Sequence, residues 1–83
     1  MNIDELYDII SQNVQFYRMN NLKYGHITKE KLSKLSEVNI RIIKNIEERK
    51  KGLVISLTAL NHIARALDIP LYKFFMKRKV KRM

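Results

Sequence analysis

Arg41 and Asn45 stand four residues apart, a spacing that places two side chains on one face of an α-helix. The forked guanidinium of arginine matches the acceptor edge of guanine, and the amide of asparagine matches the edge of adenine, in the major groove of DNA. The pair therefore predicts two base contacts. Contact with phosphate, or plain solvation of two polar side chains, is the alternative that the residues leave open.

Other side chains around this pair could extend the same surface. Ile40 is expected to point outward beside Arg41, where it would meet a thymine methyl group or would simply cover its neighbours. Cations and hydroxyls on either side are typical of phosphate contacts, which hold a protein in register on a duplex. The predicted phosphate-contacting residues are Thr28, Lys29, Lys44, Arg49 and Lys50.

Two short helices joined by a tight turn would hold these side chains in place. Thr28 can cap the first helix, and Leu32 and Leu35 then fall on one apolar face. Residues 36–37 form the turn, and Val38 plugs it. This first helix is expected to be the buried support.

The second helix of the pair carries the candidate contacts. Asn39 can cap it, and Ile43 and Ile46 line its buried face. Arg41, Lys44 and Asn45 are then left pointing outward. A helix-turn-helix has this arrangement, since it buries one short helix in order to present another.

The rest of the chain has helical periodicity and no strand alternation. A long first helix is predicted to end near Asn20, with its apolar face made by Ile3, Leu6, Tyr7, Ile10, Val14 and Tyr17. Gly52 is expected to supply the left-handed residue that ends the second short helix. Ser56 then caps a further helix, and Pro70 is expected to be the first residue of a short last helix. The inner face of the Ser56 helix is predicted to be Leu57, Leu60, Ile63, Ala64 and Leu67.

Length and charge suggest one small helical domain with a polyanionic partner. The 83 residues are 46% hydrophobic, enough for a small core, and a domain of this size gains stability from a second copy. The net charge is +9, and because the first twelve residues hold three acids and no Lys or Arg, the other 71 carry +12. A nucleic acid fits this distribution. A lysine-rich genome composition is the alternative explanation.

Several classes of protein are disfavoured by what the sequence lacks. Without cysteine there are no disulfides, which fits a reducing cytoplasm, and no apolar run approaches the roughly 20 residues of a membrane helix. The acidic N-terminus is unlike a secretion signal, so we expect a cytoplasmic protein that does not bind membranes. His26 and His62 lack partners at metal-ligand or triad spacing. We therefore expect no metal, no cofactor and no enzymatic activity.

Five motifs occur together in a specific order, although each is weak alone. They are Leu32, the Ser36-Glu37-Val38 turn, Ile43 with Ile46 and Glu47 before a basic loop, the stretch 63–69 (Ile-Ala-Arg-Ala-Leu-Asp-Ile), and Leu71 with Phe75. In this order they resemble the lambda-repressor and Cro-like helix-turn-helix family, over roughly residues 10 to 76.

The resemblance implies an all-α, five-helix DNA-binding domain over residues 1–76, followed by a basic tail at 77–83. It implies a homodimer that binds an inverted-repeat operator on double-stranded DNA and regulates transcription, as a repressor or as a restriction-modification controller. An ion pair between Arg18 and Glu47 would orient the recognition helix. Leu71, Phe74 and Phe75 would contribute to the dimer interface.

Three residues depart from the family pattern. Lys29 stands where glutamine is usual, so we expect it to contact phosphate by charge. Ser33 replaces a small alanine between the two helices. Glu37 occupies a turn position that is usually glycine, and a positive φ there would cost roughly 1 kcal/mol.

Two questions stay open at this level. The tail from Lys77 to Met83 has five cations in seven residues and could be a DNA-backbone arm, a membrane-surface patch or a disordered solubilising segment. The alternative function is a protein-interaction module, such as the antitoxin of a toxin-antitoxin pair, in which the same helices mainly hold a second protein.

Overall fold

Residues 1–78, which the computed structural model describes, form four α-helices and one 3-10 helix. The elements are α1 (Ile3–Met19), α2 (Lys29–Ser36), α3 (Ile40–Glu47), α4 (Leu57–Ala66) and the 3-10 helix η1 (Leu71–Phe75). The predicted all-α class is confirmed, because this part of the chain has no strand beyond an isolated bridge between Asn21 and Gly25. The predictions for the tail at 79–83 concern residues outside the described part of the chain.

A short last helix lies where it was expected, whereas the place given to Pro70 is wrong by one residue. The last element is a 3-10 helix that begins after Pro70 rather than at it. Lys73 N donates to Pro70 O (3.2 Å), the three-residue step that defines this tighter helix. Five residues make fewer than two turns of a 3-10 helix, so the element depends on packing rather than on its own hydrogen bonds.

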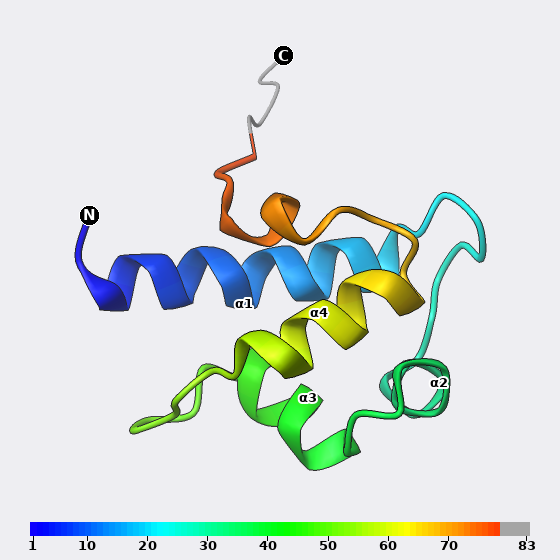
Figure 1. Cartoon of the computed structure of the whole chain (residues 1–83), viewed down its shortest axis with the longest axis horizontal. Coiled ribbons are helices and arrows are strands. Elements are labelled where there is room, and N and C mark those ends of the chain that lie inside the picture. The colour runs from blue at the N-terminus through cyan, green and yellow to red at the C-terminus, as the bar shows by residue number, and fades with distance from the viewer. Residues whose placement is uncertain (79–83) are drawn as a thin grey trace.

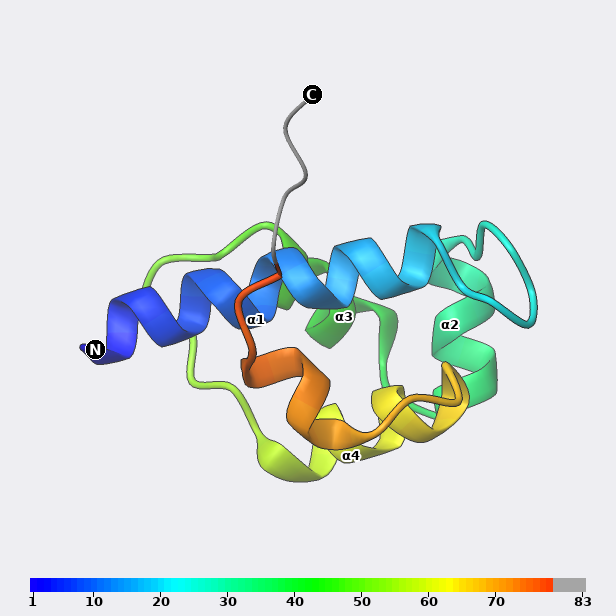
Figure 2. The ribbon, with the colours of Figure 1, turned by 90° about the horizontal axis from the view of Figure 1, so that it is seen from above.

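α1 is the element around which the others are arranged (Figures 1 and 2). It contacts η1 and α3, which lie above and below it in Figure 1, while α4 packs against α2 and η1. Asn2 caps α1 by accepting a hydrogen bond from Glu5 N (2.8 Å), and the acids of the first turn suit the positive end of the helix dipole. None of the helices in residues 1–78 is long and apolar enough to cross a bilayer.

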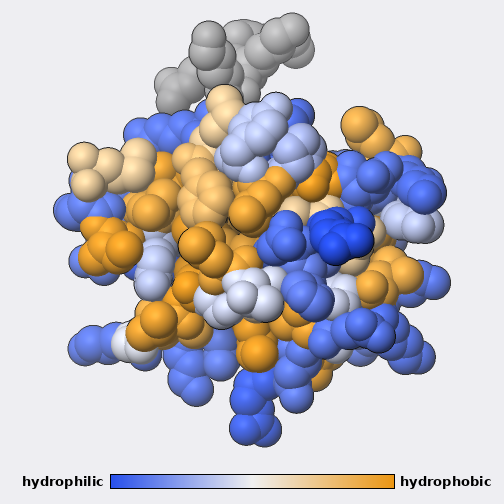
Figure 3. Space-filling view, in the orientation of Figure 1, coloured by the Kyte–Doolittle hydropathy of each residue, from blue (hydrophilic) through white to orange (hydrophobic). Residues whose placement is uncertain are grey.

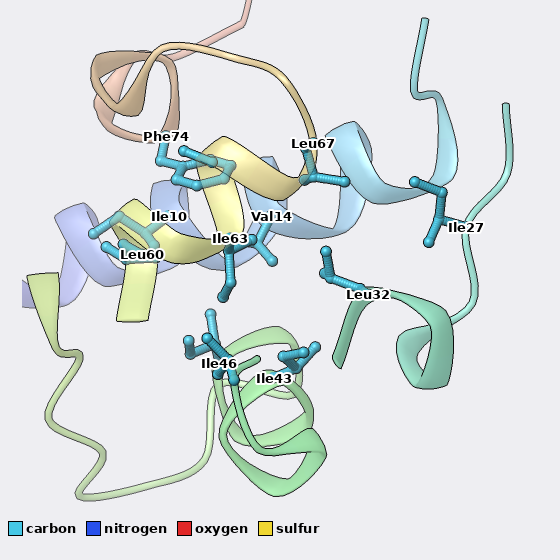
Figure 4. Packing of buried hydrophobic residues seen from close by; sticks show 12 residues of the cluster. Ile10, Val14, Ile27, Leu32, Ile43, Ile46, Leu60, Ile63, Leu67 and Phe74 are labelled. Atoms are coloured by element: carbon cyan, nitrogen blue, oxygen red, sulfur yellow. The ribbon is translucent and has the colours of Figure 1, made fainter. Parts of the chain in front are cut away.

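One apolar core joins the helices (Figure 4). Ile43 and Ile46 of α3 point up toward Ile63 of α4, and all three are at most 1% exposed. Phe74 of η1 is completely buried in the same cluster. The buried apolar residues are Ile9, Ile10, Val14, Ile27, Leu32, Val38, Ile43, Ile46, Leu60, Ile63, Ala64, Leu67 and Phe74.

Three residues predicted to be buried are exposed. Leu35 is 39% exposed because α2, with only eight residues, packs through Leu32 and Ser36 and buries one narrow stripe. Leu57 (63%) and Ile3 (61%) lie in the first turns of α4 and α1, beyond the edge of the core. Each of the three has the spacing of the apolar face of its helix, but this spacing does not show how far along the helix the core extends.

The three predicted caps are confirmed. The side chain of Thr28 accepts a hydrogen bond from Lys31 N (3.1 Å), and that of Ser56 accepts one from Ala59 N (3.3 Å). Asn39 accepts one from Arg41 N (2.8 Å). Each cap satisfies a backbone donor that has no partner within the first turn of its helix.

Glycine does not end α3, contrary to the prediction for Gly52. The left-handed residue after α3 is Arg49, with φ of 53°, and Gly52 (φ 79°) lies in the following turn, which Leu53 N closes on Lys50 O (3.1 Å). Glu37 ends α2 with φ of 61° and ψ of 20°. Glu37 therefore does adopt the positive φ whose cost was considered for this turn position.

Glu37→Gly should stabilise the protein, because glycine adopts this conformation without the clash that Cβ makes. The matched control is Glu37→Ala, which removes the same carboxylate but keeps Cβ. We expect the glycine variant to exceed the alanine variant by about 0.5–1 kcal/mol, the strain relieved less the extra chain entropy of glycine. Urea denaturation measures both variants, and an alanine variant of equal or greater stability would show that φ at residue 37 carries no strain.

Candidate nucleic-acid interface

Hydrogen bonds inside the turn fix how α3 follows α2. The hydroxyl of Ser36 donates to Leu32 O (2.7 Å) and accepts from Val38 N (3.2 Å). The hydroxyl of Ser33 donates to Val38 O (2.6 Å), so the serine that replaces alanine in the family pattern holds the turn. Val38 is 7% exposed and plugs the turn as predicted. Side chains of the segment itself thus hold the turn between the two short helices.

α3 has one buried face and one solvent face. Ile43 and Ile46 are at most 1% exposed, whereas Arg41 and Lys44 are exposed. Asn45 and Ile40 are half-buried, so Ile40 covers its neighbours and still keeps accessible surface. The structure therefore places Arg41, Lys44 and Asn45 on the outer side of one helix, as the spacing predicted.

The outer side of α3 belongs to the lower edge of the molecule in Figure 1, and hydrophilic side chains project from this edge in Figure 3. Segment 28–51 carries eight Lys and Arg residues against four acids. One of the four, Glu47, is neutralised by an ion pair. Cations therefore predominate around α3.

The predicted phosphate contacts divide into two groups. Lys44 and Lys50 are exposed and Lys29 is half-buried, and none of the three makes an ion pair within residues 1–78. Thr28 is exposed, with its hydroxyl engaged as the cap of α2. Arg49 differs from the others because its side chain contacts α1, where Nε lies 2.6 Å from Asp8 Oδ1.

A buried ion pair joins α3 to α1, as the resemblance implied. Arg18 donates Nε to Glu47 Oε2 (2.7 Å) and Nη2 to Glu47 Oε1 (2.8 Å), and the two side chains are 7% and 2% exposed. Arg18 Nη1 also donates to Ile27 O (2.8 Å), just before α2. The hydroxyl of Ser11 donates to Glu47 O (2.9 Å). One arginine thus orients both helices of the candidate interface.

Polar residues in the buried stripe of α1 were not singled out from the sequence. Asn13, 2% exposed, donates Nδ2 to Phe74 O (2.9 Å) and Met76 O (2.8 Å) and holds η1 on α1. Its Oδ1 accepts from Arg78 Nε (2.8 Å), and the Arg78 guanidinium lies 3.8 Å from the centroid of the Phe16 ring. A signal existed, since Asn13 falls between apolar positions of the predicted stripe.

The C-terminal elements bear on the predicted dimer interface and on the basic tail. Phe74 is completely buried within its own chain, so it has no surface to offer a second copy and is wrong as an interface residue. Leu71 and Phe75 are half-buried and keep such surface. Arg78, the second residue of the basic tail, packs on the side of α1 away from α3, where the ribbon turns red in Figure 1.

No protein-family model, curated protein or solved structure matches this chain. Among residues 1–78, no three acidic or histidine side chains gather into a possible metal site.

Glu47→Ala should cost on the order of 3 kcal/mol of unfolding free energy, because it leaves the guanidinium of Arg18 buried without its counter-ion. Glu48→Ala is the matched control, since Glu48 is the next residue, is exposed and carries the same charge. Thermal and urea denaturation of both variants measure the difference. A Glu47→Ala variant as stable as Glu48→Ala would mean that the pair is open to water.

Proposed function

We propose that this chain is a sequence-specific DNA-binding protein that regulates transcription. In this proposal α2, the turn and α3 are a helix-turn-helix, and α3 is the recognition helix. One observation carries the proposal: α3 buries Ile43 and Ile46 on one side, presents Arg41 and Lys44 on the other, and is held at its end by the buried pair of Glu47 with Arg18. Such a helix, fixed at its back and polar at its front, fits a major groove.

Affinity would come mainly from phosphate contacts. Lys29 lies in the first turn of α2, where free backbone N–H groups and the helix dipole also favour an anion. Lys44 and Lys50 flank the outer face of α3 without an acidic partner in residues 1–78. Each phosphate contact releases counter-ions, so binding should weaken with rising salt.

Sequence preference would come from the outer face of α3. The exposed side chain of Arg41 has the reach for guanine, and the half-buried amide of Asn45, one turn further along, suits adenine. The accessible part of Ile40 can meet a thymine methyl group. A single short helix reads few base pairs, so specificity would need two copies on a symmetric site.

The alternative is a module that holds a second protein. Competition separates the two functions: binding to one duplex that survives an excess of random duplex supports the regulator. A chain that co-purifies stably with another protein and shows no preference among duplexes would favour the alternative.

The roles of Arg41 and Lys29 are tested by their alanine variants on an operator obtained by selection from random duplexes. Arg41→Ala should cost about 1–3 kcal/mol on the operator and less on scrambled DNA, because a base contact carries sequence information. Lys29→Ala should weaken both duplexes together and lower the slope of log affinity against log salt by about 1.

Lys23→Ala is the control, since Lys23 is an exposed lysine in the connector between α1 and α2. It changes net charge as Lys29→Ala does. If Arg41→Ala weakens both duplexes equally while Lys29→Ala alters the preference between them, the two roles are reversed.

Assembly is tested by sedimentation at micromolar concentration, alone and with DNA. If Leu71 and Phe75 join α4 in a two-fold interface, the chain should sediment as a dimer, its recognition helices about 34 Å apart, and the selected operator should be an inverted repeat. Phe75→Glu should shift the protein toward monomer. Sedimentation as a monomer under every condition would exclude this interface.

A further inference from the structure

Arg49 is surrounded by groups from the first turns of α1. Its Nε donates to Asp8 Oδ1 (2.6 Å), and its Nη2 donates to Asp4 O (3.2 Å). Its guanidinium carbon lies 5.4 Å from the centroid of the Tyr7 ring. The Arg49 side chain is only 27% exposed, although Arg49 lies just after the end of α3, close in sequence to the exposed cations of that helix. The Asp4 carboxylate is also near, with Oδ1 3.8 Å from Arg49 Nη2, so three residues of α1 hold one guanidinium.

The backbone at Arg49 explains why its side chain leaves the row of cations on α3. With φ of 53° it breaks the helical register that places Arg41 and Lys44 on one face. An isolated surface ion pair contributes little, so Asp8 alone would give up Arg49 to a phosphate easily. Here the exchange would also remove the hydrogen bond to Asp4 O and the contact with Tyr7.

The connector between α3 and α4 is tied to the protein at both ends. At its start, Arg49 N donates to Ile46 O (3.2 Å) and Lys50 N donates to Asn45 O (3.1 Å). Near its end, Ile55 N donates to the hydroxyl of Tyr7 (3.2 Å). In Figure 1 the connector lies below the N-terminal half of α1, on the same side of α1 as α3.

Lys50 and Lys51 lie between these two attachments and are both exposed. They belong to the turn that Leu53 N closes on Lys50 O. Neither makes an ion pair within residues 1–78. The connector thus carries three cations. Arg49 is paired with α1, whereas Lys50 and Lys51 make no ion pair in residues 1–78 and lie near the end of α3.

We propose that Arg49 is a positioning residue rather than a DNA contact: Asp8 and its neighbours on α1 hold it, and through it they fix the connector that presents Lys50 and Lys51 to phosphate. The contact of Arg49 with α1 is observed in the structure. The contact of Lys50 and Lys51 with phosphate rests on the proposed function. The acidic start of α1 therefore shapes the basic surface instead of merely lowering the net charge.

Reversing the ion pair tests this role. Arg49→Asp places a residue that tolerates positive φ at position 49, and it should weaken operator binding severalfold. The double variant Arg49→Asp/Asp8→Arg restores the pair and the net charge, and should bind within about twofold of the wild type with an unchanged salt slope. If Arg49 instead contacts phosphate, the double variant stays weak and the slope falls by about 1, which overturns the proposal.

Arg49→Asp/Glu5→Arg is the matched control. It has the same net charge as the reversed pair, but Glu5 is not among the groups that contact Arg49. Rescue by Asp8→Arg and not by Glu5→Arg supports the positioning role. Equal rescue by both would show an effect of net charge alone and would overturn it.

The contact of Arg49 with α1 can be tested without DNA by measuring the hydrogen-exchange rate of the Ile55 amide, which donates to Tyr7 at the other end of the connector. Exchange should be faster in Arg49→Asp and return to the wild-type rate in the reversed pair only. Equal rates in the wild type and Arg49→Asp would overturn the positioning role of Arg49, whereas a wild type that binds no duplex contradicts the proposed function. The two failures are thus distinguishable.

Discussion

The ion pair between Arg18 and Glu47 is the contact on which the candidate interface depends. Burying two charges is unfavourable unless their hydrogen-bonding groups are satisfied, and here the pair is bidentate with a third bond from Arg18 to Ile27 O. No buried side-chain nitrogen or oxygen in residues 1–78 lacks a partner. Because these bonds meet α1, the entry to α2 and the end of α3, a change at either residue would reorient the whole surface.

A second constraint is the uneven distribution of charge. The acids at the start of α1 and the cations of segment 28–51 lie on neighbouring elements, joined where Asp8 meets Arg49. The remaining cations around α3 have no such partner in the described chain and form a positive edge. The chain segment that ends at residue 78 lies on the other side of α1 from α3 in Figure 1, and Arg78 contacts Asn13 of α1, so Arg78 is not part of this edge.

Local features were predictable from the sequence, and long-range ones mostly were not. The caps at Thr28, Asn39 and Ser56 follow from residues within one turn of each position. The ion pair of Arg49 with Asp8 was not predicted, because the two residues lie 41 positions apart and no local pattern links them.

Burial was also harder to predict than helical phase. Leu57 had the right spacing but lies beyond the core, and Phe74 was assigned to an interface although its own chain encloses it. Asn13 bonds to carbonyls about 60 residues along the chain, which composition cannot reveal. Arg18 and Glu47 were the exception, because a family resemblance carried the long-range information.

In the proposed function, α3 and the start of α2 form the surface that meets DNA. Backbone amide shifts, followed by NMR as a duplex is titrated into the labelled protein, test it most directly. We predict that the largest shifts fall on residues 28–30 and 39–51, while the amides of η1 and residues 76–78 change little. Shifts centred on Lys73, Lys77 and Arg78, with α3 unchanged, would contradict the account.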